Sequence, residues 1–229
     1  MLAVLGLGFV LGLRHALDAD HIAAVGAMVS ERPGWRTALR TGLLWGLGHS
    51  AALFVAGALV IGLHLVIPDM LARALEAAVA LMVLLLGGAA LGRALRTRSD
   101  VHVHFHAHGR RVHRHLHFHD ADTGWHEPHR IARIGIKPLL VGTLHGLAGS
   151  AALTLLVLAQ ISSASLGFAY LIVFGAGSIG GMGLLSVAIG LPFTATLARP
   201  GWNRALRIAA GAAGVLFGCA YAWSHIRLA

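Results

Sequence analysis

One apolar segment contains a compact cluster of ionisable residues, Arg14-His15-Ala16-Leu17-Asp18-Ala19-Asp20-His21. Apolar stretches flank it at 2–13 and 22–29, so we expect the cluster to lie at membrane depth. An ionisable side chain at that depth costs about 2–3 kcal/mol or more, and such side chains usually face a cavity and carry function. Imidazole and carboxylate ligands together suit Ni, Co, Zn, Cu or Fe better than Na⁺ or K⁺. The cluster therefore predicts a transition-metal site.

Helical spacing indicates which of these side chains can act together. At about 100° per residue, His15, Asp18 and His21 follow one another at intervals of about 60° and share a broad face. Asp20 lies about 140° from His15 on a regular helix. Two interpretations of Asp20 stay open. Its carboxylate orients an imidazole from behind, or the helix is distorted here, as membrane helices are where they line a site.

Two further histidines are candidates for the same metal path. His49 lies in the glycine-rich apolar stretch Leu44 to Phe54, and His145 lies in a similar stretch of the second half. A histidine alone in a membrane helix is often a hydrogen-bonded packing residue, so packing is the alternative interpretation for both.

A second constellation lies between residues 98 and 133, where ten of the 16 histidines fall between His102 and His129. They include two alternating runs, whose members are His102, His104, His106, His108, His113, His115, His117 and His119. Period-two spacing places alternate residues on one face of a strand, so two such strands would form a histidine-lined hairpin. Histidine-rich tracts bind metal by composition. We predict metal buffering, capture or sensing here, and the alternative is a basic, solvated linker.

The elements that position these residues are predicted to be membrane helices. Hydrophobic residues make up 57% of the chain and charged residues 12%, against about 25% charged in soluble domains. A spanning helix needs about 20 mostly apolar residues. Six segments qualify: 2–29, 37–67, 71–96, 135–160, 164–194 and 201–227. The predicted fold class is an all-α, polytopic membrane protein with six transmembrane helices, of which the first, second and fifth are long enough to be tilted or broken.

The two halves of the chain resemble each other. Leu13 to Ala24 aligns with Thr143 to Thr154, which places His15 over His145. Two more stretches agree on nearly the same offset: Trp45 to Phe54 aligns with Phe174 to Gly183, and Leu75 to Gly87 aligns with Leu206 to Gly218. Three helices per copy would invert the second copy, a transporter feature. We predict one three-helix repeat over 1–96, a histidine-rich loop over 97–134, and a second repeat over 135–229.

Charge gives the orientation. The net charge is +9, and most arginines lie in three segments, between the first and second, third and fourth, and fifth and sixth predicted helices. The positive-inside rule places these loops in the cytoplasm, so both termini are predicted outside and the histidine-rich loop inside. The basic balance therefore indicates a lipid bilayer as partner and no nucleic acid.

Two motifs resemble those of a known family. His15, Asp20 and His21 match the HX4DH signature of the nickel/cobalt transporter (NiCoT) family, and Gly48-His49-Ser50 resembles its GHS element. Larger members carry the signature in their second membrane helix and acidic signatures in their second half. This chain has it in the first helix and lacks those carboxylates, so it looks more like the small permeases associated with urease accessory genes. The resemblance implies transport of Ni²⁺ or Co²⁺ across the cytoplasmic membrane, with urease or hydrogenase maturation proteins downstream.

These observations predict a permease for Ni²⁺ or Co²⁺, most simply for uptake, with the ion as transported ligand, no resident cofactor and no enzymatic activity. The first alternative is an efflux system of similar fold, loaded by the histidine-rich loop. The second is a membrane metalloenzyme such as a di-iron oxygenase, a class that needs several histidine clusters near the cytoplasmic face. The third is a metal sensor without transport.

Overall fold

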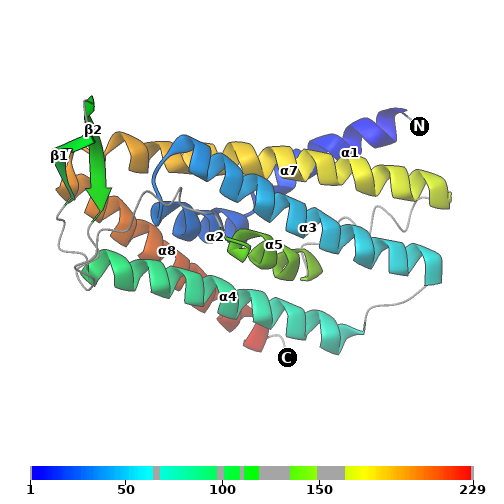
Figure 1. Ribbon diagram of the computed structural model, residues 1–229. Coiled ribbons are helices and arrows are strands. Elements are labelled where there is room, and N and C mark those ends of the chain that lie inside the picture. Colours follow the sequence, from blue (N-terminus) through cyan, green and yellow to red (C-terminus); the bar gives the residue numbers. More distant parts are fainter. Residues whose placement is uncertain are drawn as a thin grey trace.

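The computed structural model describes residues 2–63, 68–96, 101–108, 111–118, 135–148 and 163–227. In this part of the chain seven helices form an elongated bundle, with a two-stranded hairpin at one end (Figure 1). The helices are α1 (Leu2–His15), α2 (Ala19–Ser30), α3 (Trp35–Leu63), α4 (Asp69–Arg96), α5 (Lys137–Leu147), α7 (Ala164–Ala195) and α8 (Pro200–Arg227). The structure is therefore almost entirely helical, as the hydropathy predicts.

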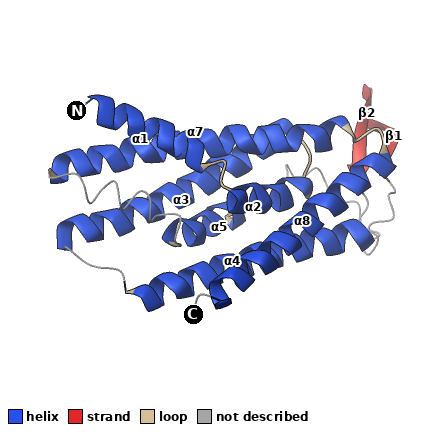
Figure 2. Ribbon diagram, turned by 180° about the vertical axis from the view of Figure 1, so that it is seen from behind, coloured by secondary structure: helices blue, strands red, loops and turns tan. Residues whose placement is uncertain are grey.

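The helices are arranged so that two short ones lie inside. Helices α1, α3 and α7 pack together on one side of the bundle, and α4 and α8 form a long pair on the other (Figures 1 and 2). Between them lie α2, which contacts α4, α7 and α8, and α5, which packs mainly on α3. The short helices therefore end in the interior of the bundle.

Four helices are long and apolar enough to cross a membrane: Trp35–Leu59, Asp69–Arg96, Ala164–Ala195 and Pro200–Ser224. Helices α1 and α2 pass the same test as a pair bent by 54°, which agrees with the expectation that the first segment is tilted or broken. These account for five of the six predicted spans. Of the remaining one, 135–160, helix α5 covers Lys137–Leu147, and residues 149–162 lie outside the described part. The number six therefore stays a prediction.

The outer faces of the long helices are apolar. Leu85 is 63% exposed, Leu184 68% and Leu216 70%. Contact between such a surface and water is unfavourable, whereas contact with lipid tails is not. In contrast, the buried core is built around α2, with Val25 and Val29 against Trp45, Val83 and other core residues. This inside-and-outside pattern is that of a multi-pass membrane protein.

Glycines allow the closest helix crossings. A β-carbon at Gly12 of α1 would overlap the carbonyl oxygen of Phe174 in α7 and lie 2.9 Å from the Ser178 nitrogen. A β-carbon at Gly142 of α5 would likewise overlap the carbonyl oxygen of Trp45 in α3. Small residues permit this approach of two backbones in membrane helices. The α1–α7 and α3–α5 crossings therefore depend on glycine.

An ion-pair cluster joins three helices at the end of α2. Glu31, the residue that follows α2, contacts Arg93 of α4, and its Oε1 lies 3.4 Å from Nζ of Lys137 in α5. The side chains are 46% exposed at Arg93 and 52% at Lys137. Pairs this exposed contribute about 0–1 kcal/mol each, so the cluster orients the helix ends more than it stabilises the bundle.

The predicted histidine hairpin is present in the structure. Strands β1 (Val101–His108) and β2 (Arg111–Phe118) pair antiparallel. The register places three histidine pairs opposite each other: His102 with His117, His104 with His115, and His106 with His113. His108 pairs with Arg111, and His119 lies outside the described residues.

Candidate metal centre

The site forms where the first segment breaks. Helix α1 ends at His15 and α2 begins at Ala19. In the intervening turn the Leu17 amide donates to the Arg14 carbonyl at 2.8 Å, and the Asp18 amide donates to the His15 carbonyl at 3.1 Å. Asp18 precedes α2 with extended backbone angles, but its side chain does not cap that helix. It is directed instead to His15.

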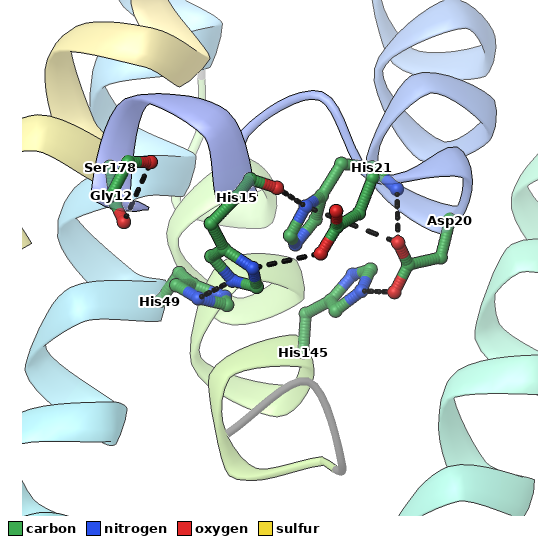
Figure 3. Close-up of polar contacts among 8 residues, drawn as sticks. Gly12, His15, Asp20, His21, His49, His145 and Ser178 are labelled. Atoms are coloured by element: carbon green, nitrogen blue, oxygen red, sulfur yellow. Dashed lines mark hydrogen bonds and ion pairs between the residues drawn. The ribbon is translucent and has the colours of Figure 1, made fainter. Parts of the chain in front are cut away.

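His15 connects two helices through its ring. Its Nδ1 lies 2.9 Å from Oδ2 of Asp18, and its Nε2 lies 2.9 Å from Nε2 of His49 in α3 (Figure 3). Because a carboxylate accepts, His15 donates from Nδ1. The Asp18 side chain is 48% exposed, whereas that of His15 is 8% exposed. Asp18 is therefore the accessible carboxylate of this group.

His21 is fully buried, and its tautomer follows from its partner. Nδ1 lies 2.8 Å from the backbone oxygen of His15. Since a carbonyl oxygen only accepts, Nδ1 carries the proton and the lone pair is on Nε2. Nε2 is buried and has no hydrogen-bond partner among the described residues. Metal-binding histidines typically donate their other N–H to a carboxylate or a backbone carbonyl, so His21 has the arrangement of a ligand.

Asp20 joins α2 to α5, which lies 125 positions further along the chain. Its Oδ2 accepts from Nε2 of His145 at 2.8 Å (Figure 3), and its Oδ1 accepts from the backbone amide of His21 at 2.9 Å. Asp20 also lies in the first turn of α2, where the helix dipole favours a negative charge. The bond to Asp20 leaves the lone pair of His145 on Nδ1, which is buried without a partner in the described structure.

The four imidazoles form one cluster. The ring centroid of His21 lies 4.6 Å from that of His15, 5.2 Å from that of His49 and 4.5 Å from that of His145. Two sets of three residues offer ligand atoms that all lie within 4.8 Å of one another: His15, His21 and His49 form one set, and Asp20, His21 and His145 form the other. Three neutral nitrogens, or two with a carboxylate, suit a borderline divalent metal.

All six side chains that the sequence singles out around the membrane segments thus lie together: His15, Asp18, Asp20, His21, His49 and His145. The break satisfies both interpretations of Asp20. The helix is distorted, and the carboxylate orients an imidazole. The histidine hairpin lies apart, at one end of the bundle (Figure 1).

Two aromatic residues of the site were not predicted. The ring of Trp45 lies 5.0 Å from that of His21 and 5.9 Å from that of His145, and the ring of Phe174 lies 5.5 Å from that of His15. Trp45 is 0% exposed and Phe174 3%, so both exclude water from the imidazoles. The alignment of the two halves places Trp45 over Phe174, and this shared aromatic position could have marked both residues as part of the site.

The geometry can be set beside known proteins. A family model described as NicO, high-affinity nickel-transport protein, matches residues 1–199. The chain belongs to the NicO family. A curated relative, the urease accessory protein UreH of Bacillus sp. (strain TB-90), is 33% identical over 229 residues, covering 98% of this chain and 92% of the relative. No solved structure matches the chain. The residues that match the NicO model include both the buried histidine cluster and the hairpin.

Proposed function

We propose that this chain is a permease that carries Ni²⁺ into the cell across the cytoplasmic membrane, through the cluster at the α1–α2 break. The observation that carries the proposal is the position of the ligands: four imidazoles and a carboxylate meet between apolar helices, where ionisable groups are costly unless they act. Membership of the NicO family supports nickel as the ion.

Charge and geometry support a divalent ion with nitrogen ligands. With neutral imidazoles the site carries two negative charges, from Asp18 and Asp20, which a divalent cation neutralises. Nε2 of His15 and Nε2 of His49 lie 2.9 Å apart in a hydrogen bond, which a bound metal would replace. Imidazole nitrogens together with carboxylate oxygens suit Ni²⁺. Co²⁺ fits the same ligands and is the second candidate.

We further propose six spans in two inverted repeats, with both termini outside and the hairpin in the cytoplasm. Equivalent contacts recur between the halves and support the repeat. Gly12 meets the Phe174 carbonyl as Gly142 meets that of Trp45, Gly177 meets the Phe9 carbonyl as Gly48 meets that of Leu139, and Gly87 meets the Val215 nitrogen as Gly218 meets that of Leu84. Each pair matches the offset of 129 to 131 residues seen in the sequence. Inverted repeats allow alternating access by rocking one half against the other.

In this mechanism the ion loses part of its hydration shell as the imidazoles replace it. Asp18, the exposed carboxylate, attracts the hydrated ion, and the buried imidazoles then bind it. Trp45 and Phe174 keep water from the cluster while access changes sides. The paired histidines of the hairpin buffer nickel on the cytoplasmic side, and the urease accessory name of the UreH relative suggests urease maturation proteins as recipients.

The test is flux of radiolabelled Ni²⁺ into proteoliposomes. His15→Ala and His21→Ala should lower flux at least tenfold, while deletion of 101–119 should leave most of it. Asp69→Asn, which alters an exposed carboxylate at the start of α4, is the matched control and should transport normally. Unchanged flux in both histidine variants would refute the site, and loss of flux in the deletion alone would move it to the hairpin.

Direction is tested in cells. Uptake predicts that expression raises cell nickel at low external nickel, whereas efflux predicts that it lowers cell nickel. Competition with unlabelled Co²⁺ in the flux assay ranks the two ions. A stoichiometric redox iron in the purified protein would favour the enzyme alternative, and binding without flux would favour a sensor.

A further inference from the structure

Two sets of metal ligands meet at the α1–α2 break, and they have one member in common. His15, His21 and His49 form the first position, and Asp20, His21 and His145 form the second. Both positions use His21 of α2. The first adds His15 of α1 and His49 of α3, and the second adds Asp20 of α2 and His145 of α5. Only His21 belongs to both.

His21 has one nitrogen to offer. Its Nδ1 donates a hydrogen bond to the His15 carbonyl at 2.8 Å, so Nε2 is the one ring atom with a lone pair for a metal. Nε2 is buried and unpartnered among the described residues. One lone pair binds one metal ion at a time, and the two positions therefore compete for it.

We propose that nickel crosses the cluster in two successive steps, bound first with His15 and His49 and then with Asp20 and His145, while His21 holds it throughout as the pivot. This inference rests on the proposed transport of nickel, and it specifies how one ion moves through the site. The wild-type cluster then holds one ion, never two.

The surroundings give the order of the two positions. The first adjoins Asp18, whose side chain is 48% exposed and 2.9 Å from Nδ1 of His15. The second is more enclosed, since the side chain of Asp20 is 13% exposed and that of His145 is 1% exposed. The ring centroids of His21 and His145 are 4.5 Å apart, so a short movement transfers the ion. A metal thus arrives at the accessible carboxylate and passes inward toward α5.

The experiment separates binding from flux in the full-length protein. Histidines 102, 104, 106, 108, 113, 115, 117 and 119 are first replaced by asparagine, so that the hairpin does not add bound metal. Equilibrium dialysis with radiolabelled Ni²⁺ measures ions per chain, and proteoliposomes measure flux. The variants are His49→Ala for the first position, His145→Ala for the second, and His21→Ala for the pivot, each with a matching glutamine variant in case alanine disturbs folding.

One ion per chain is expected from the cluster. His49→Ala and His145→Ala should each still bind one ion, with affinity changed less than about tenfold, because one position remains. Each should lose flux at least tenfold, because the ion can no longer pass from one position to the other. His21→Ala should lose both binding and flux. Two ions bound to the cluster in the parent protein, or loss of binding in parallel with flux in both His49 and His145 variants, would refute the two steps and leave the permease standing. Absence of nickel flux in the parent protein would instead refute the proposed function.

Discussion

Gly12 sets how closely α1 approaches α7, and Gly12→Ala should therefore damage the metal site without touching a ligand. A new β-carbon would lie 2.9 Å from the Ser178 nitrogen, and closer still to the Phe174 carbonyl oxygen. Ordinary contact begins at 3.4 Å, so the two helices must separate by at least 0.5 Å. Both neighbouring groups are backbone and cannot rotate away. His15 lies one turn after Gly12 and moves with it.

The magnitude follows from overpacking, which typically costs about 1–3 kcal/mol. Nickel binding requires the native ligand geometry, and in the variant that geometry brings this strain. A cost of about 1–3 kcal/mol on binding weakens the affinity for nickel about 5- to 150-fold. A functional site tolerates displacements of only about 0.5 Å, so the separation worked out above is enough to matter. We expect flux at subsaturating nickel to fall by the same factor.

The assay is nickel flux in proteoliposomes together with thermal unfolding in detergent. Gly6→Ala is the matched control, because it lies on the same helix and a β-carbon there meets nothing within 4 Å. It should transport normally and melt at the same temperature or slightly higher, since alanine favours helix over glycine. Normal flux and stability in Gly12→Ala would show that the α1–α7 crossing does not position His15.

Three further outcomes are expected. Asp20→Asn should lower nickel flux in proteoliposomes about five- to tenfold, because a neutral acceptor holds the His145 N–H about 1–1.5 kcal/mol less strongly than a carboxylate does. Glu31→Gln should lower the unfolding free energy by no more than about 1 kcal/mol, with a smaller loss at high salt, since its partners are half exposed. Flux should fall when the pH is lowered far enough to protonate the imidazoles, because a protonated imidazole cannot bind a metal. A transport rate that rises on acidification would contradict neutral histidine ligands.

Residue type and hydropathy are sufficient to predict much of this molecule. A charge at membrane depth is so costly that His15, Asp18, Asp20 and His21 could be singled out by their apolar surroundings alone. The long helices follow from the length of the apolar runs. The hairpin follows from period-two spacing of the histidines, since strand geometry has the same period.

The internal arrangement of the site could not be predicted in the same way. The break comes at Ala16-Leu17-Asp18, which contains neither proline nor glycine, and alanine and leucine favour helix. The bond between Asp20 and His145 joins residues 125 positions apart, and no local pattern encodes it. Trp45 and Phe174 lie in glycine-rich membrane segments, where hydropathy does not show which side of the helix is buried. Their role depends on which helix face meets the cluster, and packing decides that.

The break in the first helix and the candidate metal site are one feature. In a continuous helix the His15 carbonyl would accept from the amide four residues later. Because the chain turns after His15, that carbonyl accepts both from the Asp18 amide and from Nδ1 of His21. The second bond fixes the proton on Nδ1 and leaves the Nε2 lone pair for a ligand. The same turn brings Asp20 to His145. A helix-breaking distortion at membrane depth is tolerated where it is buried in protein or lines a cavity, and here the hydrogen bonds that stabilise it are those that orient the ligands.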